Sequence, residues 1–402
     1  MTITAAETVP PFRTTPLYWM AVGSFAIGTE GFMIAAVLPS MSADLAVSIQ
    51  AAGQLMTIFA LTYALSSPLM TALTGSVDRR NLLIASMAVF AAANVVAAVA
   101  PSYWALAAAR VLLAIAAGLY VPGANALAGA LVPPNRRGRA LAIVNGGMSM
   151  AVALGVPLGA LIGAHFGWRM MFAGVGVLAA VALSGLLVGL PQGIGSGIPV
   201  ANIRERLAVA RQPAALHALM VTMLWATGTY TLYAYVASYL AAVANFQGSH
   251  IGYALFMWGA AAFAGVVIGG FATDRFGNRR VISIALPLLA VALVSLSLTA
   301  KYLTVTQAMA PVLVALIVWG ASAWGFFPAQ QARLIEITGL KGASIALSLN
   351  ASFMYFGFSL GAALGAFVLS QGSVSDLGWV GGSSVLAAFA VSRIARPQPL
   401  SI

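Results

Sequence analysis

Cysteine is absent from the 402-residue chain, and charged residues make up only 7% of it. Without cysteine there is no disulfide, no thiolate nucleophile and no cysteine-based metal site. Soluble domains carry about 25% charged residues, so this chain has too little polar surface to face water. Hydrophobic residues make up 61% and glycine supplies 41 residues, a composition that favours helices packed closely together in a lipid bilayer.

Histidine and acidic residues are also scarce, at three and eight. We therefore expect no metal site and no Ser–His–Asp catalytic set, and the sequence has no Gly-Lys-Ser/Thr phosphate-binding loop. These features predict that the protein is not an enzyme and needs no cofactor. A net charge of +11 would favour nucleic-acid binding in a soluble protein. Here the positive charges lie in short loops between apolar segments, so no nucleic-acid partner is expected.

Twelve apolar segments are long enough to cross a bilayer, which takes about 20 helical residues. They cover residues 17–39, 50–73, 82–100, 102–130, 140–163, 170–190, 215–242, 250–271, 281–300, 307–328, 343–370 and 376–393. With the N-terminus inside, 16 of the 19 basic residues fall on the inner side, Arg169 and Lys301 on the outer side, and Arg110 within a span. This bias predicts that both termini are cytoplasmic.

The two halves of the sequence repeat each other. The stretch Gly155 to Ala164 reads against Gly357 to Ala366, and Asp78-Arg79 reads against Asp274-Arg275. Parallel six-helix repeats are typical of transporters with the substrate site between the halves. The predicted fold is therefore an all-α membrane protein of twelve transmembrane helices in two pseudo-symmetric six-helix bundles. The predicted domains are an N-terminal bundle 1–190, a cytoplasmic linker 191–214 and a C-terminal bundle 215–402.

The loop after the eighth span contains Gly270, Asp274, Arg275, Gly277 and Arg279. It resembles the motif that the major facilitator superfamily carries between helices two and three, here in its second-half copy. The resemblance implies a conformational latch, in which an acid at a helix end pairs with nearby arginines and holds the cytoplasmic side closed. The first-half copy, with Asp78 and Arg79, is one residue short between its glycine and its acid and lacks the later glycine.

Two further segments resemble the twelve-span drug/proton antiporters of this superfamily, particularly the bacterial sugar efflux permeases of the arabinose type. They are Thr29-Glu30-Gly31-Phe32 and Gly155-Val156-Pro157-Leu158-Gly159. The resemblance implies efflux of a small molecule across the bacterial inner membrane in exchange for protons, by a monomer. Pro157, between Gly155 and Gly159, is expected to kink its helix so that the halves can rock.

Glu30 and Arg110 are the charges that we place deep within spans of the first half. At 1.5 Å per residue each lies about 12–13 Å from the outer end of its helix, and this matched depth predicts that they pair. Embedded charges face a cavity or a partner because they are costly in lipid. A carboxyl that is buried beside a movable cation can bind a proton in one state and release it in another. Glu30 is the predicted proton site and Arg110 its switchable partner; a static structural ion pair is the alternative.

The seventh span presents a predicted substrate face. At 100° per residue, Trp225, Thr229 and Tyr233 share one face, and Tyr230 lies beside it. Aromatic faces with hydroxyl tips suit a drug-like, nucleoside-like or sugar-like ligand. Trp319 and Asn350 are weaker candidates from the tenth and eleventh spans.

Three functional readings stay open from the sequence. Proton-coupled antiport of a sugar, nucleoside or amphiphilic drug is preferred. A facilitator of the same fold would move substrate without protons. A channel or membrane scaffold is disfavoured, because a pore needs rings of charges or carbonyls and only one embedded acid is visible.

Overall fold

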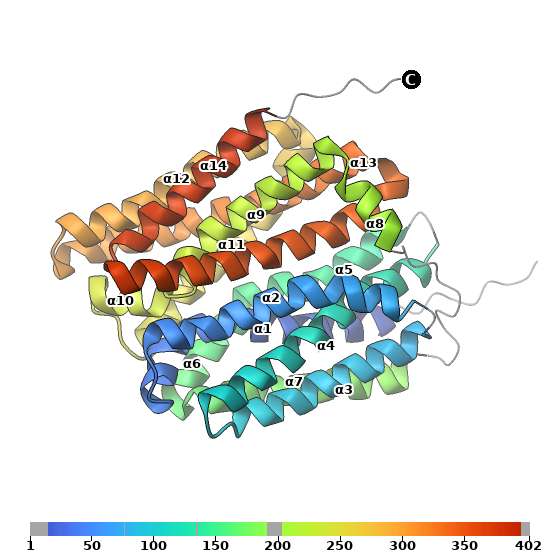
Figure 1. The fold of residues 1–402 in the computed structure, drawn as a ribbon, viewed down its shortest axis with the longest axis horizontal. Helices are drawn as coiled ribbons and strands as arrows, with labels where there is room; N and C mark the ends of the chain where they lie inside the picture. The colour runs from blue at the N-terminus through green and yellow to red at the C-terminus, as the bar shows by residue number, and fades with distance from the viewer. Residues whose placement is uncertain (1–14, 76, 134–135, 191–202, 395–402) are drawn as a thin grey trace, which may run out of the picture.

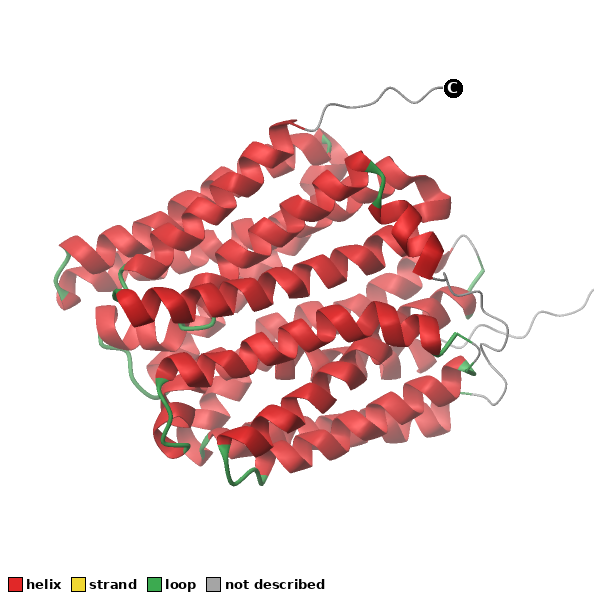
Figure 2. Cartoon of the chain, viewed as in Figure 1, coloured by secondary structure: helices red, strands yellow, loops and turns green. Residues whose placement is uncertain are grey.

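A computed structural model describes residues 15–75, 77–133, 136–190 and 203–394. These residues form helices joined by short turns, without a strand among them (Figures 1 and 2). Most helices run roughly side by side along the long axis of the molecule (Figure 1).

The first half of the chain is built from seven helices and one π-helical turn. They are α1 (Thr15–Asp44), α2 (Ile49–Leu73), α3 (Arg79–Ala98), α4 (Tyr103–Ala130), α5 (Arg137–Met150), the π-helical turn η2 (Ala151–Gly155), α6 (Val156–Phe166) and α7 (Trp168–Gly189). Helix α5, η2 and α6 together make one membrane-length segment, Arg137–Phe166. Pro157 is the second residue of α6, just after η2, and since proline lacks an N–H it cannot donate the normal helical hydrogen bond.

The short helix α8 (Ile203–Ala210) precedes the second half. The elements of the second half are α9 (Pro213–Tyr233), α10 (Val236–Ala244), α11 (Ser249–Phe276), α12 (Asn278–Tyr302), α13 (Val305–Gln371) and α14 (Asp376–Ile394). Helix α8 lies within the predicted linker 191–214, of which residues 191–202 are outside the described part of the chain. Helix α13 breaks at Gly339, whose φ of 66° is open to glycine and strained for other residues.

Local side chains define several helix starts. Ser48, Asp78 and Ser102 each accept a hydrogen bond from a backbone N–H in the first turn of α2, α3 and α4, respectively. These bonds satisfy donors that a helix leaves unpaired at its N-terminus. Gly167 and Gly277, with φ of 84° and 83°, form the tight turns between α6 and α7 and between α11 and α12.

Two predicted spans need correction. Residues 215–242 do not form one continuous helix, because the chain turns at Ala234 and Tyr235 and divides into α9 and α10. Within the described residues, eleven helical segments are long and apolar enough to cross a membrane, and α9 is not among them. Its threonines and tyrosines lower its hydropathy. The tenth span was predicted to end at 328, but the helix continues to Gly339.

Glycines allow the closest helix contacts inside each half. Gly357, Gly361 and Gly365 of α13 lie against the backbone of α9, where an added Cβ would overlap the carbonyl oxygens of successive α9 turns. In the first half, an added Cβ at Gly155 would overlap the side chain of Thr29 in α1. Small residues at such interfaces let backbones approach within van der Waals contact in lipid.

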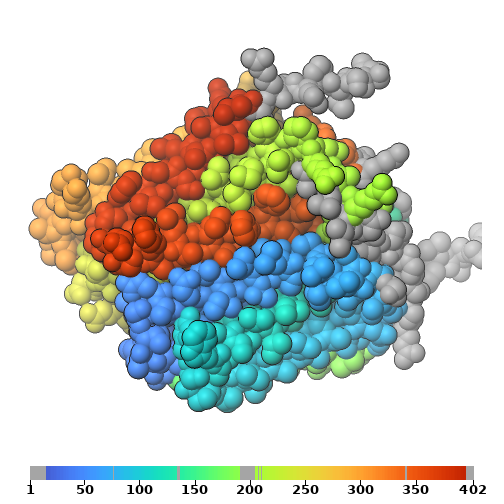
Figure 3. Space-filling model, in the orientation of Figure 1, coloured from blue at the N-terminus to red at the C-terminus, as the bar shows by residue number. Residues whose placement is uncertain are grey.

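The two halves meet along three helix pairs: α2 with α13, α6 with α11, and α1 with α10. The space-filling view shows the second part of α13 packed directly on α2 (Figure 3). We call the end of the bundle with the turns α2–α3, α4–α5 and α11–α12 the basic end, and the other end the opposite end. Helix α11 packs on η2 and α6 more extensively than on α5, so the halves contact mainly in the middle and toward the opposite end.

Candidate functional site

An ion pair lies buried inside the first half. Glu30 of α1 and Arg110 of α4 form a salt bridge, and both side chains are 0% exposed. The Arg110 guanidinium also donates to the Leu55 carbonyl at 3.3 Å and lies 4.2 Å from the centre of the Phe59 ring. The matched depth of the two charges in the sequence predicted this pairing.

The ion pair is incompletely satisfied. The Oε2 atom of Glu30 and one terminal nitrogen of Arg110 are buried without a hydrogen-bond partner in the described part of the chain. A buried polar atom without a partner costs about 1–3 kcal/mol, and more when it is charged. Such a pair is poorly optimised as a purely structural element. The Oε2 atom of Glu30 can accept a proton, and the unpaired Arg110 nitrogen can donate a hydrogen bond to another group.

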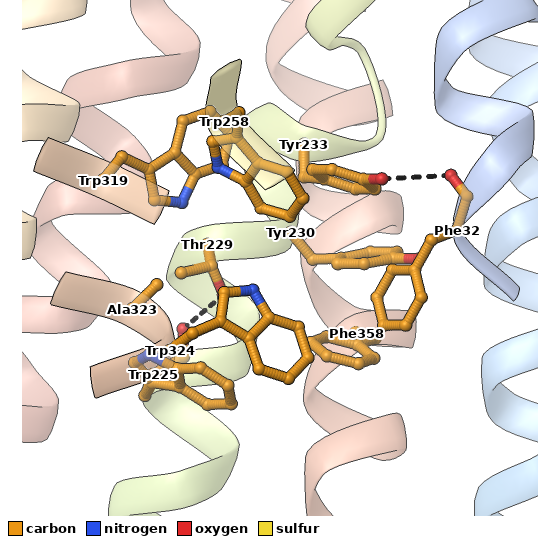
Figure 4. Close-up of a pocket in the computed structure, with 10 residues that line it drawn as sticks. All are labelled: Phe32, Trp225, Thr229, Tyr230, Tyr233, Trp258, Trp319, Ala323, Trp324 and Phe358. Carbon is orange, nitrogen blue, oxygen red and sulfur yellow. Dashed lines mark hydrogen bonds between the residues drawn. The ribbon is translucent and has the colours of Figure 1, made fainter. Parts of the chain in front are cut away.

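A pocket lies beside this pair, at the junction of the two halves (Figure 4). Helix α9 contributes Trp225, Thr229, Tyr230 and Tyr233; α13 contributes Trp319, Ala323, Trp324 and Phe358; α1 contributes Phe32 and α11 contributes Trp258. In this conformation the space holds water-sized molecules only. A larger ligand therefore requires the surrounding rings, or the two halves, to move apart.

The pocket is tied to the helix that carries Glu30. Tyr230 donates a hydrogen bond to the Gly31 carbonyl at 3.3 Å. Tyr233 donates to the Phe32 carbonyl at 3.1 Å (Figure 4). The two acceptors are the first and second residues after Glu30. Any displacement of these tyrosines by a ligand therefore acts on α1 next to the buried carboxyl.

Aromatic rings also connect the ion pair with the pocket. Phe59, which lies beneath Arg110, contacts Tyr355 with ring centres 6.4 Å apart. Tyr355 contacts Phe358 at 5.6 Å, and Phe358 stacks on Tyr230 at 4.3 Å. A chain of ring contacts from both halves thus links Arg110 with the pocket.

Five of the six predicted cavity residues line this pocket: Trp225, Thr229, Tyr230, Tyr233 and Trp319. Asn350 is not among the lining residues. It is 1% exposed, and its Oδ1 accepts a hydrogen bond from Thr222 at 2.6 Å. Gln330 in turn donates to the Thr222 hydroxyl at 3.0 Å. Asn350 therefore belongs to a buried polar cluster between α9 and α13.

Five lining residues are not among the predicted cavity residues: Phe32, Trp258, Ala323, Trp324 and Phe358. Helical periodicity finds residues on one face of one helix, and these five come from α1, α11 and α13. Trp258 could have been found from its depth, since tryptophans of membrane proteins gather near the membrane–water interfaces. It lies nine residues from the start of α11, well inside the span.

The predicted latch residues lie at the basic end. Asp78 caps α3, Arg79 donates to the Gly75 carbonyl at 2.8 Å, and Arg80 donates to the Leu190 carbonyl at 2.7 Å. In the second copy, Asp274 and Arg275 are exposed at the end of α11, and Gly270 has open space around it. Arg279 is also exposed. Among the described residues, neither Asp78 nor Asp274 forms an ion pair.

The opposite end of the first half is held by a second charged cluster. Asp44 at the end of α1 pairs with Arg169 at the start of α7, and it accepts a hydrogen bond from the Trp168 indole at 3.1 Å. Arg169 also donates to the Ala100 carbonyl at 3.1 Å. The cluster joins α1, α7 and the turn after α3.

Two helical bundles that enclose a pocket between them, within a chain of membrane-spanning helices, define a polytopic membrane transporter. Residues 20–362 match the family model of the Major Facilitator Superfamily. The chain belongs to this superfamily, and it is accordingly a multi-pass membrane transporter for small molecules and not an enzyme.

Curated relatives of similar length support this assignment. The chain is 33% identical over 382 residues to the uncharacterized MFS-type transporter YbcL of Bacillus subtilis, with 95% of this chain and 96% of the relative covered. It is 31% identical over 389 residues to the inner membrane transport protein YdhP of Escherichia coli K12, with 96% and 97% covered. A chloramphenicol resistance protein of Streptomyces lividans is 35% identical, with 71% and 73% covered.

Solved structures share the fold. A bacterial homologue of the human lysosomal transporter Spinster, in an inward-facing and unoccupied conformation, superposes with a TM-score of 0.72 at 17% identity, covering 96% of each chain. The human organic anion transporter MFSD10 gives a TM-score of 0.72 at 16% identity, covering 95% of this chain and 100% of that one.

Proposed function

We propose that the protein is a proton-coupled antiporter that exports a small organic molecule by alternating access. Glu30 binds the proton, and Arg110 is its switchable partner. The observation that carries this proposal is the buried, incompletely satisfied ion pair beside a pocket whose tyrosines bond to the backbone next to Glu30.

Coupling is expected because Arg110 and the proton compete for the Glu30 carboxylate. When Glu30 is paired with Arg110, the two charges compensate each other in a site without water-exposed surface. When ligand moves Tyr230 and Tyr233, α1 shifts and the pair is weakened. A buried carboxylate that loses its cation is costly, and proton uptake removes that cost. Proton binding and substrate binding therefore favour different arrangements of the two halves.

The proposed orientation has the basic end in the cytoplasm, because basic residues concentrate on the cytoplasmic side of membrane proteins. Substrate then enters from the basic end, the contacts near Asp274, Arg275 and Arg279 rearrange, substrate leaves at the opposite end, and Glu30 takes up a proton to reset the carrier. Gly155, Pro157 and Gly159 supply the bend in the α5–α6 segment, next to the π-helical turn.

The substrate class is drawn from relatives and from the pocket together. A relative named as a chloramphenicol resistance protein favours amphiphilic drugs. An aromatic pocket without charged lining residues is compatible with a neutral ligand. Chloramphenicol is therefore the first compound to test, with sugars and nucleosides beside it.

Proton movement in energised inverted vesicles tests the proposal. We expect substrate to release protons in wild type, and Glu30→Gln to abolish this release while exchange of labelled substrate for unlabelled substrate continues. Retained exchange shows that the variant is folded; if exchange is also lost, the double variant Glu30→Gln with Arg110→Met removes the uncompensated charge. Uphill transport by a folded Glu30→Gln variant would refute coupling and leave a facilitator with a static ion pair.

A further inference from the structure

The pocket contains an unusual set of polar atoms. Three of its lining tryptophans, Trp225, Trp258 and Trp319, have buried indole N–H groups without an acceptor in the described part of the protein. Each of these side chains is at most 3% exposed. Indole nitrogen only donates hydrogen bonds, and buried tryptophans normally find a partner for it. Three unpaired donors around one pocket therefore need a common explanation.

The hydroxyl groups of the pocket already donate their protons to backbone carbonyls. Tyr230 and Tyr233 direct their protons to backbone carbonyls of α1, and Thr229 donates to the Trp225 carbonyl at 2.8 Å. Only the lone pairs of these oxygens remain to accept hydrogen bonds. The lining has no carboxylate, guanidinium, ammonium or amide side chain. The pocket therefore has three unpaired N–H donors, and its side-chain acceptors are limited to hydroxyl lone pairs.

We infer that the pocket selects neutral, flat aromatic molecules that carry oxygen acceptors, such as carbonyl or nitro groups, and few N–H or O–H donors. Aromatic walls provide stacking surface, and the indole N–H groups of Trp225, Trp258 and Trp319 provide hydrogen bonds to the acceptors. This inference rests on the proposed function, since it names the substrate class of the same pocket.

The same balance disfavours two other ligand classes. A sugar carries many hydroxyl donors, and each one that is buried without an acceptor weakens binding. An organic cation would gain from the aromatic faces, but it would leave the indole donors unpaired and would lie near Arg110. The pocket therefore disfavours polyols, whose hydroxyl donors stay unpaired, and cations, which leave the indole donors unpaired.

A pair of compounds with the same outline tests the inference. Menadione carries two carbonyl acceptors and no donor, whereas methylnaphthalene has a similar ring system without the oxygens. Because the chain has no cysteine, the quinone cannot react with a thiol of the protein. We expect calorimetric titration of the purified protein, with detergent blanks, to give an affinity for menadione roughly tenfold or more above that for methylnaphthalene.

Single tryptophan variants identify the donors. Trp258→Phe and Trp319→Phe retain an aromatic ring and remove the N–H group. Each should weaken menadione binding roughly threefold to tenfold more than it weakens methylnaphthalene binding, because both compounds lose ring contact and only menadione loses a hydrogen bond. Trp104→Phe is the matched control, because Trp104 is 77% exposed and lies outside the pocket.

Four results would overturn the inference. They are equal affinity for the two compounds, menadione binding that is unaffected by both pocket variants, preferential binding of arabinose or tetraphenylphosphonium, and failure of menadione to bind at millimolar concentration. The proposed coupling is tested separately by Glu30→Gln, so a carrier with normal proton release and no preference for menadione would contradict only the ligand class.

Discussion

The two members of the buried ion pair differ in how they can lose their charge. A carboxyl becomes neutral by taking up a proton, whereas a guanidinium stays charged in proteins. Removal of one partner therefore has unequal consequences for Glu30 and Arg110, although the two side chains are equally buried.

We predict that Glu30→Gln destabilises the protein more than Arg110→Met. The first variant leaves a buried guanidinium without its counter-charge, a change that costs about 3–5 kcal/mol. The second leaves a carboxyl that can be protonated. Combining the two substitutions should recover most of the loss, because no buried charge remains. Thermal unfolding of the three variants in one detergent gives the comparison; a double variant less stable than Glu30→Gln would contradict this account.

At the residue scale, the sequence predicted that Glu30 pairs with Arg110 and that one face of α9 lines a cavity. Charge within a span is conspicuous, and helical periodicity groups Trp225, Thr229 and Tyr233. The orphan indole of Trp258 and the role of Asn350 in a polar cluster were beyond the sequence, because both depend on which helices become neighbours.

Among the elements, hydropathy located the helices well because each span must be apolar over its own length. Most predicted ends lie within a few residues of those observed. The exceptions have physical causes: α9 carries polar and aromatic pocket residues and stops at Tyr233, and the helix that includes Pro328 continues beyond the apolar stretch to Gly339. Hydropathy averaged over a window of residues marks neither the end of α9 at Tyr233 nor the continuation of the other helix to Gly339.

The contact of α13 with α9 gives a prediction at this scale. Gly361→Ala introduces a methyl group that overlaps the Thr227 carbonyl and Tyr230, so we expect a loss of about 1–3 kcal/mol. Gly129→Ala in α4 meets nothing within 4 Å and should change stability by no more than about 1 kcal/mol. Unfolding midpoints of the two variants measured side by side test this; equal midpoints would show that α9 and α13 separate readily.

For the whole molecule, the distribution of basic residues makes a prediction about orientation. With α9 and α10 acting together as one crossing, we expect twelve crossings and both ends of the chain on the cytoplasmic side. Green fluorescent protein fused after residue 402 should fluoresce in a bacterial host, since it folds in the cytoplasm. Alkaline phosphatase inserted at Gly248, in the turn between α10 and α11, should be active, because the proposed orientation places that turn outside. An inactive insertion at Gly248 together with loss of fluorescence at the C-terminus would show that α9–α10 does not cross, because five crossings then follow it.

The contacts between the halves have one further property. Tyr230, Tyr233 and Gln50 all reach across the interface to backbone carbonyls, those of Gly31, Phe32 and Leu369. Every amino acid offers the same carbonyl, so the accepting positions are free to change their side chains over generations without losing these bonds. Selection can therefore change the substrate specificity of one half while the hydrogen bonds between the halves stay in place. Related carriers with different substrates can then arise by substitution on a single face.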